Sequence, residues 1–174
     1  VDQLSEDALS RAVEEIQGIP PRETLTRDIT DALQAAAGDD RIQAVVLSLG
    51  GMEGGGLSKL RDVAGAISVF RESGKPVIAM GDSYSQGQYY LAAQADEVFM
   101  HEFGSVYLDG FGYFRTYFRE ALEKLRVDMN VFRVGEYKSF VEPFTRDDMS
   151  EEDKQAASRW LDSLWAVYGS DVTT

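Results

Sequence analysis

Two features of the sequence could carry chemistry: a glycine-rich loop and a lysine among aromatic residues. The loop covers residues 50–56 and follows the apolar run 44–49. Glycines let a backbone approach a ligand closely and point its N–H groups at an anion. Lys138 follows a second apolar run and has Tyr137 and Phe140 beside it in the sequence. Apolar surroundings penalise the charged ammonium and lower its pKa, so Lys138 would be usable as a general base.

Each feature also has a plainer interpretation. The loop is not a phosphate-binding loop, because Gly56 is followed by Leu57-Ser58 and not by a lysine with a serine or threonine. Its spacing does not fit a dinucleotide-binding fingerprint either, so it could be a tight connection between a strand and a helix. The residues around Lys138 are equally compatible with a surface lysine. Neither feature establishes a site by itself.

His101 is the single histidine, so a Ser-His-Asp triad would have to use it. It follows a predicted strand and stands beside Glu102, a position that favours a surface histidine. The chain has no cysteine, which excludes disulfides, thiol catalysis and zinc–thiolate sites. We expect neither a metal nor a cofactor.

The charge of the chain limits its partners. Its formal net charge is −13, which argues against a nucleic-acid surface and against direct adsorption to anionic lipid. With 174 residues, 44% of them hydrophobic, the chain is long enough to bury a core. No apolar run reaches the roughly 18 residues that span a bilayer. Because the sequence begins with Val1, we expect a processed or excised product whose parent could carry an anchor.

Apolar runs alternate with segments of helical periodicity along the chain. The predicted strands are residues 44–49, 76–80, 97–100 and 131–134, and the predicted helices are residues 4–16, 26–38, 57–72, 86–95, 114–125 and 150–168. Such alternation is typical of βαβ units with a mostly parallel sheet flanked by helices. We therefore expect a single α/β domain over residues 1–174.

The last predicted helix has a start signal and an apolar side. Ser150 is placed as the N-cap, with the acid Asp153 three residues later, as in a capping box. The side expected to be buried contains Trp160, Leu161, Leu164 and Trp165. The aromatic stretch 110–117 is too apolar for a simple solvent-exposed loop. We expect it to form part of an exposed apolar surface that promotes self-association, through Phe111, Tyr113, Phe114 and Tyr117.

Three stretches together resemble a known family. They are GDSYSQGQYYLA at residues 81–92, VFRVGEYKSFVEPF at 131–144 and RDDMS at 146–150. In this order and spacing they resemble the N-terminal repeat of the long, tandem-repeat form of the signal peptide peptidase A (protease IV) family. The resemblance covers roughly residues 44–168. It implies a Clp-protease/crotonase-like α/β fold and hydrolysis of peptide bonds by a serine nucleophile with a lysine base.

The resemblance assigns roles to particular residues. Lys138 matches the family's catalytic lysine, and Ser139 and Tyr137 are candidates for orienting it. Gln86 occupies the place of the nucleophile in single-repeat members, and a glutamine amide cannot form an acyl intermediate. The loop with Gly50 and Gly51 is a degenerate form of the oxyanion loop. The resemblance therefore implies that a second repeat supplies the serine and that this chain by itself is inactive.

The resemblance also implies partners and a location. The expected partners are peptide substrates (cleaved signal peptides), a second repeat of the same parent chain, and further copies in a homo-oligomer. The expected location is the periplasmic side of the bacterial inner membrane, with the anchor outside this chain. Substrate preference, oligomer size and the chain that supplies the serine are left open by the sequence.

Two alternatives share the expected fold. One is a non-catalytic crotonase-like scaffold or partner-binding domain, which the glutamine at position 86 favours. The other is an acyl-CoA-processing crotonase with a glycine-rich oxyanion hole. A CoA enzyme has no reason to place a Tyr-Lys-Ser segment at residues 137–139, and saturable CoA binding would distinguish it.

Overall fold

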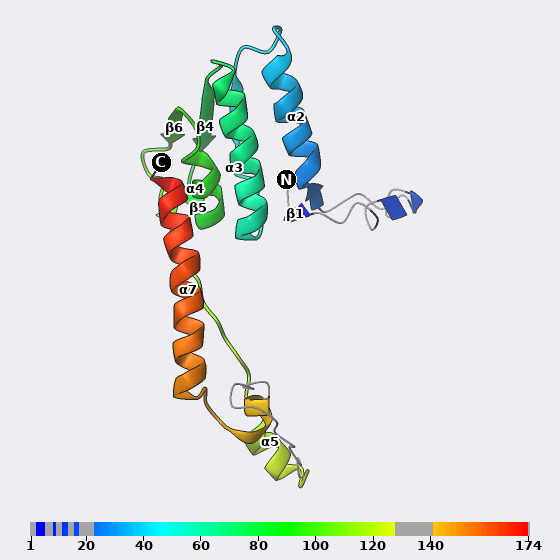
Figure 1. Cartoon of the computed structure of the whole chain (residues 1–174), viewed down its shortest axis with the longest axis vertical. Helices are drawn as coiled ribbons and strands as arrows, with labels where there is room; N and C mark the ends of the chain where they lie inside the picture. Colours follow the sequence, from blue (N-terminus) through cyan, green and yellow to red (C-terminus); the bar gives the residue numbers. More distant parts are fainter. Residues whose placement is uncertain are drawn as a thin grey trace. The chain divides into compact units, whose positions relative to one another are not determined.

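The computed structural model describes residues 3–5, 9, 12, 13, 16, 17, 23–127 and 141–173 (Figure 1). These residues group into two compact units. The first unit comprises residues 1–109 and 168–174, and the second comprises residues 110–167. The single domain expected over residues 1–174 stays a prediction, and the two units are described separately below.

The first unit is built on a three-stranded parallel sheet. Its strands are β3 (Val45–Ser48), β4 (Val77–Gly81) and β6 (Glu97–Met100), in the order β3-β4-β6. Val45 is in register with Val77, and Ile78 with Glu97. A helix connects each strand to the next, so the prediction of an α/β fold with a parallel sheet flanked by helices is confirmed.

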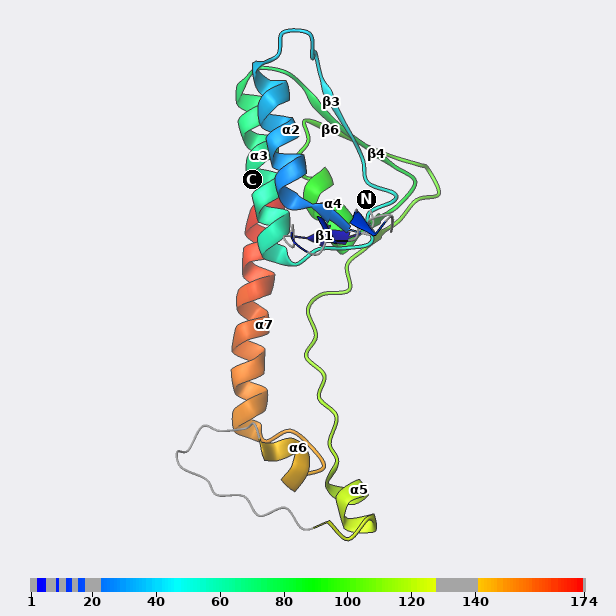
Figure 2. The same ribbon diagram turned by 90° about the vertical axis from the view of Figure 1, so that its right-hand side faces the viewer.

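Two long helices cover one face of this sheet (Figure 2). They are α2 (Thr26–Gly38), which precedes β3, and α3 (Leu57–Glu72), which joins β3 to β4. Apolar residues of α3 recur every three or four positions, so they form one stripe that is buried. That stripe consists of Leu60, Val63, Ile67 and Phe70. It packs in the core with Val77 and Ala79 of β4, both of which are fully buried.

Lys75, which lies in the loop before β4, caps the C-terminal end of α2. Its ammonium donates to the carbonyl oxygens of Ala36 at 2.9 Å, Ala37 at 3.0 Å and Asp39 at 2.8 Å. The last carbonyls of a helix have no partners within the helix, and α2 has no basic residue in its own last turn. A lysine from the loop before β4 therefore satisfies them.

Short elements complete the first unit. They are β1 (Gln3–Ser5), β2 (Glu23–Leu25), β5 (Tyr84–Ser85), α4 (Gln86–Ala92) and β7 (Val106–Tyr107). β1 pairs in parallel with β2, and β5 with β7. The prediction of a helix over residues 4–16 was wrong at its start.

Leu4 lies in β1, and residues 9, 12, 13 and 16 are helical. The side chains of Leu9, Val13 and Ile16, which recur at helical spacing in the sequence, are exposed.

The second unit holds an extended segment, two short helices and most of a long one. The helices are α5 (Arg119–Lys124), α6 (Glu142–Thr145) and α7 (Glu151–Val172), whose residues from 168 onward belong to the first unit. The predicted helix over residues 114–125 was wrong in its first part, because residues 114–118 are not helical. The strand predicted at residues 131–134 lies outside the described residues.

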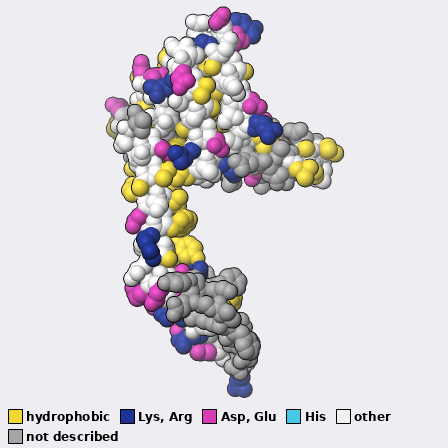
Figure 3. Space-filling view, viewed as in Figure 1, with side chains coloured by type: hydrophobic (Ala, Val, Ile, Leu, Met, Phe, Trp, Pro, Cys, Tyr) yellow, Lys and Arg dark blue, Asp and Glu magenta, His cyan; other side chains and the backbone are white. Residues whose placement is uncertain are grey.

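Aromatic rings join the extended segment to α7. The ring of Phe111 meets that of Trp165 edge-on at 6.2 Å, and Tyr113 meets Trp160 in the same way at 6.2 Å. The two tryptophans remain 52% and 44% exposed, so the prediction that this side of the helix is buried was wrong for Trp160 and Trp165. Figure 3 shows hydrophobic side chains on the surface along α7.

None of the described helices is both long enough and apolar enough to cross a membrane.

Candidate functional site

The predicted nucleophile position lies at the start of α4. Ser85 is the N-cap, and its hydroxyl accepts a hydrogen bond from the backbone N–H of Gln88 at 3.4 Å. The Gln88 side chain in turn accepts from the backbone N–H of Ser85 at 2.8 Å, which completes a capping box. Gln86 is the first residue of the helix. The Ser85 hydroxyl is thus engaged in holding the helix start.

Gln88 also ties α4 to the glycine-rich loop. Its Nε2 donates to the carbonyl oxygen of Met52 at 2.8 Å. Gly87 lies so close to that loop that a Cβ atom there would meet Met52 at 3.6 Å and Leu60 at 3.7 Å. The start of α4 and the glycine-rich loop are therefore side by side. The structure thus brings together Gln86, at the position predicted for the nucleophile, and the loop predicted to be a degenerate oxyanion loop.

Gly50 and Gly51 form the turn that leaves β3. The turn is closed by the backbone N–H of Met52, which donates to the carbonyl oxygen of Leu49 at 2.9 Å, and the Met52 side chain is buried. A Cβ atom added to Gly50 would meet nothing within 4 Å. Packing among the described residues therefore does not explain why residue 50 is glycine.

Tyr168, in the last turns of α7, anchors Gln86 from the other side. Its hydroxyl donates to the Gln86 carbonyl oxygen at 3.0 Å, and its side chain is only 3% exposed. Burial, with a smaller contribution from Tyr89, raises the pKa of Tyr168 to about 12. The phenol therefore stays protonated and keeps donating at neutral pH.

A second tyrosine, Tyr90 of α4, also binds the C-terminal end of α7. The hydroxyl of Tyr90 donates to the carboxylate of Asp171 at 2.5 Å, and Arg61 pairs with that carboxylate at 3.1 Å. The rings of Tyr90 and Tyr168 lie 5.5 Å apart. Burial first, and then the Asp171 carboxylate, raise the pKa of Tyr90. Two buried tyrosines thus hold α4 against the end of α7: Tyr90 of α4 and Tyr168 of α7.

The lysine predicted to be the base, with its two candidate orienters, lies outside the described residues. These are Lys138, Ser139 and Tyr137. The described chain resumes at residue 141 with α6, in the second unit. The structure consequently describes the segment that follows Lys138, and this segment is rich in charged contacts.

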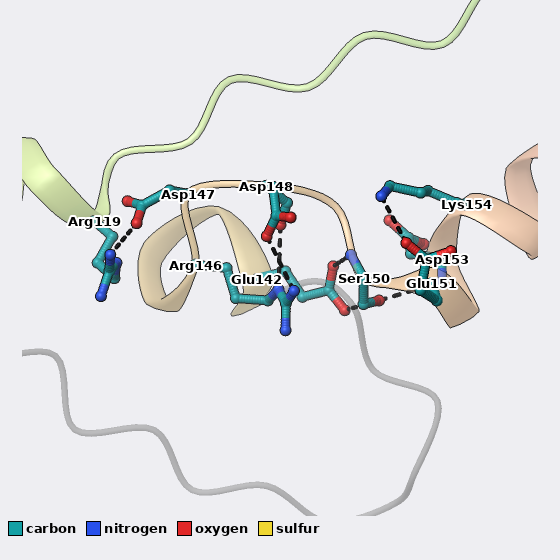
Figure 4. Close-up of polar contacts among 9 residues, drawn as sticks. All are labelled: Arg119, Glu142, Arg146, Asp147, Asp148, Ser150, Glu151, Asp153 and Lys154. Carbon is teal, nitrogen blue, oxygen red and sulfur yellow. Dashed lines mark hydrogen bonds and ion pairs between the residues drawn. The ribbon is translucent and has the colours of Figure 1, made fainter.

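Glu142 is the buried acid of that segment (Figure 4). Its side chain is 5% exposed and accepts two hydrogen bonds from Ser150, from the hydroxyl at 2.6 Å and from the backbone N–H at 3.2 Å. Burial acts to raise the pKa of Glu142. The bonds from Ser150, together with Arg146 and Arg115, outweigh it, so the pKa lies below the usual glutamate value.

The predicted capping box of α7 is half correct. The Ser150 hydroxyl accepts from the backbone N–H of Asp153 at 3.2 Å, as expected of an N-cap. The Ser150 backbone N–H donates to the Glu142 carboxylate and not to Asp153, which a capping box would require. The Asp153 carboxylate instead pairs with Arg115 at 3.2 Å, and both side chains are largely buried.

Charge pairs also hold the loop between α6 and α7. Arg119 of α5 pairs with Asp147, and Arg146 pairs with Asp148 at 3.0 Å (Figure 4). The hydrogen bond from Arg119 lowers the pKa of Asp147. The hydroxyl of Tyr117 is buried nearby and has no hydrogen-bond partner among the described residues.

His101 is exposed, and its Nδ1 accepts from the backbone N–H of Phe103 at 3.2 Å. This is the surface position expected from the sequence. In the described part of the chain, no three histidine or acidic side chains gather as metal ligands would.

Sequence reasoning missed the residues that position α4. The spacing Ser85-x-x-Gln88 is a capping-box signal and was readable in the sequence. The hydrogen bond of Gln88 to Met52 joins residues 36 positions apart, and that of Tyr168 to Gln86 joins residues 82 positions apart. No local sequence pattern predicts bonds over such separations.

Comparison with known proteins identifies the family. The sequence model of Peptidase family S49 matches residues 69–174. Protease 4 of Haemophilus influenzae is 48% identical over 153 residues, which cover 88% of this chain and 25% of that protein. Protease 4 of Salmonella typhi is 46% identical over 141 residues, covering 81% of this chain and 23% of that protein.

A more distant relative is the chloroplastic serine protease SPPA of Arabidopsis thaliana, 28% identical over 138 residues, or 79% of this chain and 20% of that protein. The chain thus spans about a quarter of the length of the curated relatives it matches. Since the S49 match covers more than half of the chain, the chain belongs to peptidase family S49, a family of proteases.

Proposed function

We propose that this chain is the lysine-bearing repeat of a longer serine–lysine peptidase that degrades cleaved signal peptides. The observation that carries the proposal is the S49 match over residues 69–174, which includes both Gln86 and Lys138. A glutamine where single-repeat members place their serine leaves this chain with a base and no nucleophile. The serine is then supplied by a second repeat of the parent protein.

The proposed reaction is acyl transfer. The serine oxygen of the second repeat attacks the carbonyl carbon of the scissile bond while neutral Lys138 takes the hydroxyl proton. The C–N bond breaks, and the lysine returns the proton to the leaving amine. Water then hydrolyses the acyl-enzyme by the same route. Lys138 must be neutral, so its pKa must lie roughly 2 to 3 units below the ordinary value of about 10.4.

The assembled enzyme is proposed to be membrane-associated on the periplasmic side of the bacterial inner membrane. Signal peptides are apolar segments released at that membrane, so an enzyme that removes them works beside it. A site divided between repeats also requires this chain to pack against its partner repeat, and we propose that copies of the parent assemble as a homo-oligomer. The names of the relatives, protease 4 and serine protease SPPA, support protease activity.

A non-catalytic scaffold is the second candidate, and one observation favours it. Ser85, the serine beside the nucleophile position, uses its hydroxyl to cap α4 and is one residue out of register. Among the described residues of the first unit, the predicted nucleophile position is therefore held by Gln86 and not by a serine. A scaffold repeat and a base-supplying repeat differ in whether Lys138 is needed for turnover by the parent.

The test compares the 174-residue chain with the full-length parent, using a fluorogenic peptide and a serine-reactive phosphonate probe. We expect the parent to turn over the peptide and to be labelled, and the 174-residue chain to do neither. Labelling of the 174-residue chain that disappears in Ser85→Ala would show that Ser85 is a nucleophile and would overturn the divided site. A parent that is neither labelled nor active would favour the scaffold.

A further inference from the structure

The outer edge of β3 has backbone groups without partners. In the sheet order β3-β4-β6, β3 pairs only with β4. The N–H of Val45 donates to the carbonyl oxygen of Pro76 at 3.0 Å, so Val45 and, by alternation, Leu47 direct their backbone groups toward β4. Val46 and Ser48 direct theirs away. No described residue makes a hydrogen bond to the backbone N–H groups of those two residues.

Among the described residues, this edge has none of the features that keep a strand edge from pairing. Natural edges carry charged side chains, a proline or a bulge, or are covered by another element. β3 consists of Val45, Val46, Leu47 and Ser48, with neither a charge nor a proline. The Val46 side chain is 57% exposed. An edge of this kind is a ready template for one more strand.

A groove beside the edge is apolar and is bounded on one side by a helix. It has a volume of about 540 Å³ and lies between α2 and the segment that leads into β3. Its walls consist of Asp28, Ile29, Ala32, Leu33, Ala36, Ile42, Ala44, Val45 and Val46. Alternate side chains of a strand point to opposite faces, so a strand placed next to β3 would direct every second side chain toward α2. The groove provides space for those side chains.

The face of the sheet opposite the helices is also open. Ser48 is in register with Met80, and Met80 with Phe99, so these side chains share one face with Val46. Met80 and Phe99 are each 51% exposed. Figure 2 shows α2 and α3 on the other face. The apolar surface next to the β3 edge therefore extends across the sheet.

We propose that the β3 edge and its groove receive a β-strand from the part of the parent protein outside these 174 residues. The curated relatives are about four times as long as the matched region, so polypeptide is present to supply such a strand. A second copy of this chain is the less favoured occupant, because two copies would each bring a net charge of −13. The strand must present apolar side chains at every second position. This inference concerns the fold and does not depend on the proposed peptidase mechanism.

Hydrogen exchange tests the proposal directly. In the 174-residue chain, we expect the amides of Val46 and Ser48 to exchange as exposed amides while those of Val45 and Leu47 are protected. In the full-length parent, we expect Val46 and Ser48 to be slowed by roughly 100-fold or more. Equal exchange of these two amides in both proteins would overturn the proposal. So would protection in the 174-residue chain that rises with its concentration, because the edge would then take a second copy.

Proline substitutions provide a matched pair on adjacent residues. Proline is tolerated where a strand's N–H points away from its neighbour and disrupts the sheet where the N–H is in the ladder. In the 174-residue chain, Val46→Pro should change Tm by less than about 3 °C, whereas Leu47→Pro should lower it by roughly 5 °C or more. In the parent, both variants should lower Tm. A parent in which Val46→Pro is as harmless as in the 174-residue chain would contradict the added strand, whatever its peptidase activity.

Discussion

The carboxylate of Glu142 and the hydroxyl of Ser150 are joined by a 2.6 Å hydrogen bond that is buried. Ser150 uses the same hydroxyl to cap α7 through the backbone N–H of Asp153. The acid of α6 and the start of α7 therefore depend on one another. Loss of either partner should therefore weaken both α6 and the first turn of α7.

Replacing Glu142 should destabilise the chain in a pH-dependent way. Glu142→Gln loses a charged acceptor of two hydrogen bonds, which should lower the free energy of unfolding by about 1–3 kcal/mol at neutral pH. The folded-state pKa of Glu142 is lowered, so its contribution is complete above the unfolded pKa of about 4.3 and is lost as pH falls through the folded pKa. Urea unfolding at several pH values between 7 and 3 measures the difference between the two proteins.

The control for this substitution is Glu152→Gln, an exposed acid in the first turn of α7. It should change the free energy of unfolding by no more than about 0.5 kcal/mol. If the difference between wild type and Glu142→Gln did not shrink as the pH is lowered, the carboxylate of Glu142 would not be charged in the folded chain.

Two tyrosines allow the same chemical change with opposite expected results. Tyr168→Phe removes the bond to the Gln86 carbonyl and should cost about 0.5–1.5 kcal/mol. Tyr117→Phe removes a buried hydroxyl that has no partner among the described residues, so it should be neutral or stabilising. Thermal unfolding of both variants gives the comparison. Equal losses in the two variants would mean that the Tyr168 bond contributes nothing specific.

High pH should remove the advantage of Tyr168 over phenylalanine. The pKa of Tyr168 is about 12 in the folded chain and about 10 in the unfolded chain. Its neutral form is therefore favoured by folding, so the contribution is complete below pH 10 and is lost as pH rises toward 12. The difference in the free energy of unfolding between wild type and Tyr168→Phe should narrow from pH 9 to pH 11. A constant difference over that range would contradict the raised pKa.

Gln88→Glu should separate the two roles of Gln88. The carboxylate can still accept from Ser85, but it cannot donate to the carbonyl oxygen of Met52. We expect a loss of about 1–2 kcal/mol and faster hydrogen exchange in the loop 50–56. Gln34→Glu, the same chemical change at an exposed position of α2, should do neither. Unchanged exchange in the loop would show that Gln88 does not hold it.

In the full-length parent, Lys138→Ala should abolish peptide turnover and leave folding nearly intact. Lys138→Arg should also be inactive, because a guanidinium does not deprotonate in this pH range. Lys124→Ala, a change of an exposed lysine in α5, is the control and should keep wild-type kcat/KM. The pH–rate profiles of the four proteins measure the effect. More than a few per cent residual activity in Lys138→Ala would return His101 to consideration as the base.

The stretch around Phe114 should govern self-association of the 174-residue chain. Phe114 is 94% exposed, so Phe114→Ser should leave Tm nearly unchanged while it reduces dye binding and association in sedimentation experiments. Phe111→Ser, by contrast, should lower Tm, because its ring contacts Trp165. A wild-type chain that stays monomeric at high concentration and binds no dye would contradict this prediction.

The strands and helices of the first unit were largely predictable. Runs of branched apolar residues predicted β3, β4 and β6 to within one or two residues, and α2 has the predicted bounds. Each of these segments carries its own apolar run or helical periodicity, so local sequence suffices to predict it. The two- and three-residue strands were not predicted, because so short a strand is defined by its partner and not by its own composition.

The second unit shows where periodicity misleads. Residues 114–118 fit a helical pattern, but they belong to an extended segment. That segment contacts α7 with alternate residues: Phe111, Tyr113 and Arg115. Period two and period 3.6 share many matches over so short a stretch. The motifs predict a site at Gln86 and at the loop with Gly50 and Gly51, and the structure brings these two segments side by side. Its supports, Gln88 and Tyr168, act over long sequence separations.

The three hydrogen bonds from Lys75 join the end of α2 to the loop before β4, although the two are far apart in the sequence. The last turn of α2 gains its cap only when the residue before β4 is in place, and that requires the whole crossover through α3. The end of α2 and the beginning of β4 therefore open and close as one cooperative unit. We therefore expect the last turn of α2 to be completed late in folding, after the chain has returned to form β4.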